Sequence, residues 1–326
     1  MSKFTRRLQK IGSSILVSLP KQWVDAHGLG KGVQVQIETT QNSLSITVDE
    51  GKKQSKEIEI LYPLSSEENL AANITGAYLL GYDIITIKGK STISVKDREV
   101  IRESIRRLVG MEILDEDASN INGQFLLDET SLNPEKILKR MSSIALGMFN
   151  ETLLTLATGD KTNLQTIPNR DDEINRQYFL LVRFIRSTMV DRRLAGIFNL
   201  ENIDILDYRV AGNILETAGD TIVELAKSIS ETILSNSDKK KIHDVGKDIE
   251  TIQKKSIDAF ITNNRSLAIE AIKLHVQYQN KISKLRSSLE HKKQIPLAFL
   301  DLVYMFEKIA QSWSDISDLV QPTYKK

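Results

Sequence analysis

The sequence predicts a multidomain α+β protein with a small β-rich unit at its N-terminus, a small α/β connector, and two tandem antiparallel three-helix bundles. Three observations support this prediction. Short alternating apolar runs characterise the first 130 residues, as expected for strands. From residue 135 onward, apolar residues recur every three or four positions, which is typical of amphipathic helices. The length of 326 residues is enough for two or three domains.

The first domain, residues 1–50, is predicted to contain a strand, a turn, a second strand and a short helix, followed by two more strands. Ile15–Leu19 is apolar and β-branched enough for a strand, and Pro20 suits the first turn of a helix. Alternating residues at 33–37 and 44–48 predict the last two strands. A unit with so few apolar residues cannot bury enough surface to be stable alone, so we expect it to dimerise.

Positive charge is concentrated in this domain. Residues 1–31 contain six basic residues and one acidic residue, whereas the whole chain has a net charge of only +1. Such a patch is typical of contact with nucleic-acid phosphates, although lysines and arginines on a surface hairpin commonly serve solubility alone. The candidate DNA-contacting residues are Lys3, Arg6, Arg7, Lys10 and Lys21.

The pattern RRLQKIGSSILVSLPKQWVDAHGL, followed by GKGVQVQIE, resembles the SpoVT/AbrB swapped-hairpin family in the form that is fused to archaeal PhoU-like proteins. The resemblance covers residues 4–49. It implies that two chains interleave their hairpins into one small β-barrel, of which each chain forms half. It also implies that the basic face of this barrel docks on DNA.

The second domain, residues 57–130, is predicted to be a small α/β connector in which strands and helices alternate. The strands are expected at 58–62, 84–87, 111–114 and 125–127. One helix is expected from Ser65 to about Leu80, and another over 95–109. The segment resembles the connecting part of archaeal PhoU-like proteins and shows no motif that carries chemistry.

Six amphipathic helices are predicted in the remainder of the chain, grouped as bundles over residues 135–235 and 239–320. The connections between them are short, which indicates antiparallel neighbours. One connection is expected at Pro168-Asn169. The predicted helices cover 135–158, 171–198, 203–235, 239–262, 265–292 and 296–320.

An internal repeat relates the third helix to the sixth. Glu216, Asp220 and Glu224 recur 91 residues later as Glu307, Gln311 and Asp315, and both rows are predicted to face away from the core of their own helix. A solvated helix face is the ordinary explanation of such a row. Carboxylates four residues apart repel one another, however, and hard cations such as Mg²⁺, Mn²⁺ or iron would relieve that repulsion.

Two tandem three-helix bundles with E-x-x-x-D on the third helix of each resemble the PhoU family, with DDEINRQYFLLVRFI and LETAGDTIVELAKSI as the most similar stretches. The resemblance implies negative regulation of phosphate uptake, through a phosphate ABC transporter or its sensor proteins, and metal bound on the acidic rows. Gln311 replaces the second aspartate of the later bundle, and Asn175 replaces the second carboxylate after Asp171. The predicted metal ligands are therefore Glu216, Asp220 and Glu224, with Glu307 and Asp315 forming a weaker site.

Several functional classes are disfavoured by the composition. The chain contains no cysteine, which excludes disulfides and thiolate catalysis, and no apolar run approaches the roughly 20 residues that span a bilayer. It lacks the hydrolase, metalloprotease and dinucleotide-binding motifs, so we expect a protein that is not an enzyme. Because no apolar run is long enough to span a bilayer, we also expect it to be cytoplasmic. We predict a DNA-binding homodimer that represses phosphate uptake. The alternatives are a regulator that acts only by contact with the transporter, and a metal-binding helical bundle.

Overall fold

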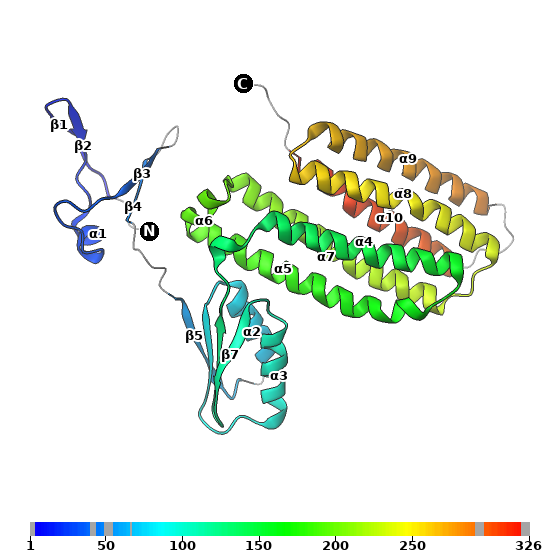
Figure 1. Ribbon diagram of the computed structural model, residues 1–326, viewed down its shortest axis with the longest axis horizontal. Helices are drawn as coiled ribbons and strands as arrows, with labels where there is room; N and C mark the ends of the chain where they lie inside the picture. Colours follow the sequence, from blue (N-terminus) through cyan, green and yellow to red (C-terminus); the bar gives the residue numbers. More distant parts are fainter. Residues whose placement is uncertain (1–3, 40–43, 49–54, 66, 291–296, 321–326) are drawn as a thin grey trace. The chain divides into compact units, whose positions relative to one another are not determined.

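The computed structural model describes residues 4–39, 44–48, 55–65, 67–290 and 297–320 (Figure 1). The chain forms two compact units, Met1–Gln54 and Ser55–Lys326. None of the helices in the described ranges is both long enough and apolar enough to cross a membrane.

The N-terminal unit contains two separate two-stranded antiparallel sheets and one short helix. β1 (Gln9–Ile11) pairs with β2 (Ser14–Leu16), α1 spans Lys21–Ala26, and β3 (Gln36–Thr39) pairs with β4 (Leu44–Thr47). The turn between β1 and β2 contains Gly12 at φ 63°, in the left-handed region that glycine adopts easily. The third predicted strand was wrong in position, because pairing with β4 begins only at Gln36.

The described side chains of this unit do not form a core. None of them is buried in the segments 4–39 and 44–48, and large apolar residues such as Leu8, Ile11 and Ile15 are more than 60% exposed. A pair of short hairpins has too little apolar surface on one chain to enclose these side chains. The described residues of this unit therefore leave large apolar side chains exposed.

The α/β part of the larger unit is a four-stranded mixed sheet in the order β5-β6-β8-β7. β5 and β6 are parallel, and the other pairs are antiparallel. Burial alternates along β6 and β8, which means that one face of the sheet is covered, and α2 and α3 pack together beside it (Figure 1). The elements are β5 (Glu57–Tyr62), α2 (Leu70–Leu79), β6 (Ile84–Gly89), α3 (Val95–Arg106), β7 (Met111–Glu116) and β8 (Asn120–Phe125).

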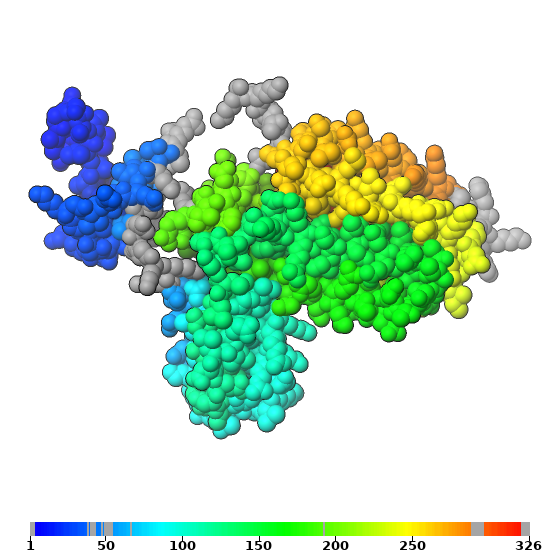
Figure 2. Space-filling model, in the orientation of Figure 1, coloured from blue at the N-terminus to red at the C-terminus, as the bar shows by residue number. Residues whose placement is uncertain are grey.

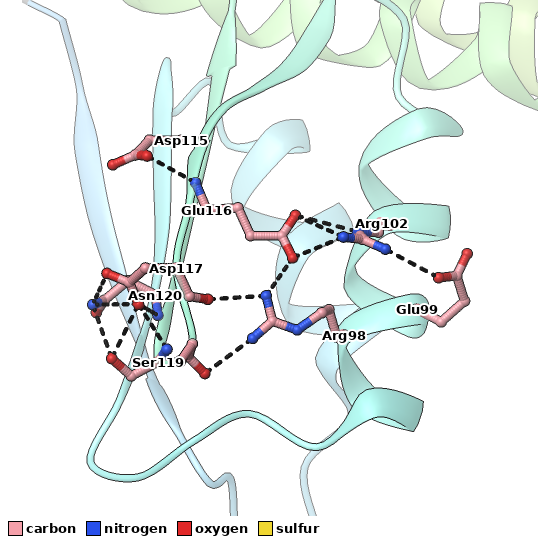
Figure 3. A network of polar contacts seen from close by, with 9 residues as sticks. Arg98, Glu99, Arg102, Asp115, Glu116, Asp117, Ser119 and Asn120 are labelled. Atoms are coloured by element: carbon pink, nitrogen blue, oxygen red, sulfur yellow. Dashed lines mark hydrogen bonds and ion pairs between the residues drawn. The ribbon is translucent and has the colours of Figure 1, made fainter.

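Two sequence predictions in this part were wrong. The first helix begins at Leu70, because the Asn69 side chain caps it and Ser65 instead bonds to Glu68. The last strand begins at Asn120 rather than at residue 125, because Asp117 forms a tight turn by accepting the backbone N–H groups of the next residues (Figure 3). A hydrogen bond from the Asn120 side chain, together with these backbone hydrogen bonds, lowers the pKa of Asp117 to about 2.

Arginines on α3 hold that helix against the edge strand β7. Arg98 and Arg102 both pair with Glu116 at the end of β7, and Arg98 also donates to the backbone carbonyls of Asp117 and Ala118 (Figure 3). The two guanidinium groups lower the pKa of Glu116. This network pairs Arg98 and Arg102 with groups of the same chain.

The rest of the chain is helical. The predicted helix over 171–198 is divided at Asp191, whose side chain caps the short helix α6. Pro168 was predicted to lie in a connection between two helices, which was wrong. It lies in the first turn of α5, where a backbone N–H would have no hydrogen-bond partner within the helix. The helices are α4 (Pro134–Thr158), α5 (Ile167–Val190), α6 (Arg192–Ile197), α7 (Asn202–Glu231), α8 (Asn236–Ile261), α9 (Arg265–Glu290) and α10 (Leu297–Asp318).

The long helices pack around one continuous core. α4, α5 and α7 contact one another, as do α8, α9 and α10, while α7 packs on α10 and α4 packs on α8. Phe149 of α4 lies edge-on to Phe306 and Trp313 of α10, so aromatic rings cross between the two sets. In Figure 2 the surfaces of α4 and α8 meet along their length.

Arg183 on α5 joins the α/β part to the helices. Its side chain is fully buried, and it donates to the backbone carbonyls of Tyr78 (3.1 Å) and Tyr82 (2.7 Å) and to the Asp83 carboxylate (2.6 Å). The guanidinium lies 3.9 Å from the centre of the Phe125 ring. A buried charge needs such partners, because an unpaired one is costly in a medium of low dielectric constant.

We predict that Arg183→Met destabilises the larger unit by about 3–5 kcal/mol, because it removes the buried donor to Asp83 and to the carbonyls of Tyr78 and Tyr82. Urea unfolding followed by circular dichroism measures the change. Arg186→Met is the matched control, because Arg186 is exposed on the same helix. Equal unfolding midpoints for the two variants would contradict the prediction.

Candidate functional site

The first acidic row lies on α7. The buried stripe of this helix includes Ala218, Ile222 and Leu225, and it packs into the core. Asp220 and Glu224 are exposed, as predicted for the opposite face. Glu216 is only half-buried, so it does not face away from the rest of the protein: burial and the charge of Asp220 both raise its pKa.

Asp171 on α5 completes this cluster. A Cβ atom at Gly219 would lie 2.7 Å from Asp171 Oδ1, so the glycine on α7 allows the two helices to approach closely at this point. Asp171 Oδ1 is buried and has no hydrogen-bond partner in the described structure, while Oδ2 accepts from Asn175 Nδ2 at 3.2 Å. Sequence reasoning did not include Asp171 among the metal ligands, although its D-x-x-x-N spacing was a usable signal.

Electrostatic repulsion is concentrated on Asp171. Burial raises its pKa to about 6, and the charges of Asp220, Glu216 and Asp172 act in the same direction. A carboxyl group in this state gains from protonation or from a neighbouring cation. Oxygen atoms of this kind suit hard cations such as Mg²⁺ or Mn²⁺. The donor set is thus chemically appropriate for a metal ion.

The arrangement of the side chains does not yet form a coordination shell. Within the described ranges, no group of three or more His, Asp or Glu side chains is close enough together to hold a metal ion. Binding at Asp171, Glu216 and Asp220 would therefore require their side chains to rotate toward one another. The metal site remains a prediction.

The carboxylates of the second acidic row, on α10, have partners among neighbouring side chains. Glu307 pairs with Arg286 of α9, and Gln311 donates a hydrogen bond to Asp315. Burial nevertheless raises the pKa of Glu307. The amide at position 311 thus removes one charge and satisfies the next carboxylate, so this row has less repulsion for a cation to relieve.

A cavity of about 470 Å³ lies beside this second row, between α9 and α10. Its lining includes Glu307, Asp315 and the buried pair His275 and Tyr278, whose rings stack with their centroids 6.4 Å apart. Burial lowers the pKa of His275, which favours the neutral imidazole. The histidine has no metal-ligand spacing in sequence, so only the packing of α9 on α10 brings it to the acidic row.

The basic candidates lie in the N-terminal unit. Arg6, Arg7, Lys10 and Lys21 are all exposed, with Lys10 on β1 and Lys21 at the start of α1. Arg6 donates to the Thr5 carbonyl at 3.2 Å and lies 5.7 Å from the centre of the Phe4 ring. Lys3 lies outside the described residues. The four described side chains are available to a polyanion.

Residues 138–229 match the PhoU domain. This family match covers most of α4, the whole of α5 and α6, and α7 as far as Ile229, and it contains Asp171, Glu216 and Asp220. It supports the resemblance to the PhoU family that the helical part of the sequence shows. No curated protein matches the chain.

Two solved structures are similar to the helical part of the chain. The phosphate transport system regulatory protein PhoU from Streptococcus pneumoniae aligns with a TM-score of 0.48 and 20% identity, over 57% of this chain and 91% of that one. PhoU from Pseudomonas aeruginosa aligns with a TM-score of 0.43 and 15% identity, over 57% of this chain and 93% of that one.

We predict that Asp171→Asn stabilises the protein at neutral pH. The pKa of Asp171 is raised from its ordinary value of 3.8 to about 6 in the folded state, so its contribution to stability is present below pH 4 and is lost as the pH rises through 6. After a discount for solvent screening, the gain at pH 7 is roughly 1 kcal/mol. Unfolding in chelator at pH 4 and pH 7 tests this.

The matched control for Asp171→Asn is Glu224→Gln. Glu224 lies in the same acidic row, but it is exposed and is not among the charges that raise the pKa of Asp171. The Asp171 variant should gain stability only at pH 7. A gain of the same size at pH 4, or one matched by the Glu224 variant, would refute the assignment.

Proposed function

We propose that this protein is a negative regulator of phosphate uptake of the PhoU type. The observation that carries the proposal is the PhoU-domain match over residues 138–229, which places Glu216 and Asp220 of the E-x-x-x-D motif inside the matched segment. The helical part receives or relays phosphate status through a phosphate ABC transporter or its sensor proteins. The protein acts without catalysing a reaction.

In this proposal the N-terminal unit makes the protein a DNA-binding homodimer. The exposed apolar residues of the unit, and the lack of buried side chains over its described segments 4–39 and 44–48, favour association with a second copy. Its basic side chains neutralise DNA phosphates: Lys3, Arg6 and Arg7 precede β1 in the sequence, Lys10 lies on β1, and Lys21 begins α1. Dimerisation doubles this basic surface and gives the swapped-hairpin barrel that the AbrB resemblance implies.

DNA binding is tested by fluorescence anisotropy with duplexes from upstream of phosphate-transport genes and with shuffled duplexes, at two salt concentrations. We predict tighter binding to the upstream duplex and a steep loss of affinity with salt. Arg6→Ala/Arg7→Ala should weaken binding by about tenfold or more, since each lost phosphate contact reduces affinity.

The control for this experiment is Arg106→Ala/Arg107→Ala, which removes two exposed arginines from the α/β part. It should bind DNA as the wild-type protein does. If neither duplex binds, or if both double variants are weakened equally, the N-terminal unit serves as a dimerisation module only.

A second candidate function is regulation by protein contact without DNA binding. The observation that favours it is that the PhoU-domain match lies entirely within the larger unit. That unit has its own hydrophobic core. That unit could engage the transporter whether or not the N-terminal unit touches DNA. Absence of DNA affinity in the experiment above would favour this function.

We also propose that the first acidic row binds a divalent or iron-type cation through Glu216, Asp220 and Glu224, with Asp171 as an additional ligand. Glu307 and Asp315 bind more weakly, because Arg286 and Gln311 already engage them. We predict that Glu216→Ala/Asp220→Ala removes most of the metal found by elemental analysis of protein purified without chelator.

The control for the metal experiment is Glu307→Ala/Asp315→Ala, which removes the same number of carboxylates from the second row. This variant should lose little metal. If the first variant retains as much metal as the wild-type protein, the site does not exist on this row.

A further inference from the structure

A second cavity, of about 460 Å³, lies where the end of α4 meets the beginning of α8. Figure 1 shows these two helix ends side by side. One wall is formed by the last turn of α4 and its cap, residues 156–159, and the other by Asn236, Lys239, Lys240 and His243 of α8. Every ionisable residue that lines this cavity is therefore basic.

The two lysines of this cavity are unpaired. Neither the Lys239 side chain nor the Lys240 side chain has an ion-pair or hydrogen-bond partner among the described residues. Later on the same helix, Lys254 pairs with Glu250 at 2.6 Å, and Lys255 pairs with Glu270 at 2.7 Å. The lack of partners is thus specific to the end of α8 that borders the cavity.

The neighbouring carboxylates are engaged elsewhere. Asp238 is buried, and its carboxylate accepts a hydrogen bond from the Ser235 hydroxyl at the helix cap. Asp244 lies 3.8 Å from Lys247 Nζ and 3.8 Å from His243 Nδ1. Neither acid lines the cavity, although Asp244 lies beside the lining residue His243, so the two lysines carry the positive charge that remains without an acidic partner. The positive end of the α8 dipole adds to this charge, and the negative end of the α4 dipole on the opposite wall opposes it.

We infer that this cavity binds a phosphoryl group carried by a small molecule. Two ammonium groups and an imidazole that line one cavity complement a multiply charged anion better than a single carboxylate, and lysine binds phosphate as a point charge. The cavity is much larger than one phosphate ion, and Leu156 and Ala157 provide an apolar wall beside the charged one. This shape fits a nucleoside diphosphate or a short polyphosphate.

The site goes beyond the proposed function and does not depend on it. It uses none of the residues assigned above to DNA or to metal, and it lies between α4 and α8 rather than on the acidic rows. A failure of DNA or metal binding would leave it standing, and the reverse also holds. The ligand would stabilise the contact between the two sets of three helices, because α4 and α8 belong to different sets.

The test is isothermal titration of the full chain with ADP, tripolyphosphate, inorganic phosphate and adenosine, at one fixed ionic strength. ADP or tripolyphosphate is expected to bind saturably at one site per chain, with inorganic phosphate competing and adenosine not binding. Lys239→Gln/Lys240→Gln is expected to weaken binding by about tenfold or more, because it removes two charge-assisted contacts. Binding of only one of these two compounds supports the site and shows whether its ligand is a nucleotide or an inorganic polyphosphate.

Lys254→Gln/Lys255→Gln is the matched control, because it removes the same charge from the same helix at lysines that are already paired. It should retain wild-type affinity. Thermal unfolding of both variants without ligand confirms that they are folded. The inference is overturned if neither ADP nor tripolyphosphate binds, if adenosine binds as tightly as ADP, or if the two double variants lose affinity equally.

Discussion

The larger unit depends on one buried guanidinium. Arg183 on α5 donates to one carbonyl in the last turn of α2 and to one just after it, while its positive charge is balanced by Asp83 and by Glu129, whose carboxylate lies 3.7 Å away. Because a buried charge tolerates no loss of partners, this contact allows only one orientation of the sheet on the helices. The same helix carries Asp171 three turns earlier, so the anchoring of α5 also sets where that carboxylate meets α7.

The two acidic rows show how a sequence repeat can diverge in chemistry. On the first row, Gly219 lets α5 bring Asp171 against Glu216 and Asp220, which leaves negative charge uncompensated and a carboxylate oxygen without a donor. On the second row, Arg286 and Gln311 supply the missing donors from within the chain. A cation therefore has more to stabilise on the first row than on the second. The basic cavity at the start of α8 is the converse case, since its lysines lack acidic partners.

The N-terminal unit follows a different physical logic. Its strands are too short to enclose a core, so its apolar residues stay exposed on one copy of the chain. The larger unit has a continuous core that runs from Ile60 to Ile316 and needs no partner to form it. Association through the small unit would bring two copies of the larger one together without requiring any contact between their helical parts.

Local patterns in the sequence determined most of the helices after residue 133, the strands near residues 58 and 84, and the acidic rows, because periodicity and caps act within a few residues. The sequence also located the N-terminal basic side chains. Tertiary structure alone decided that α7 packs on α10, and that Asp171, His275 and Lys239 lie close to particular residues of other helices. Those outcomes depend on which distant segments meet, and periodicity within one helix carries no information about its neighbours.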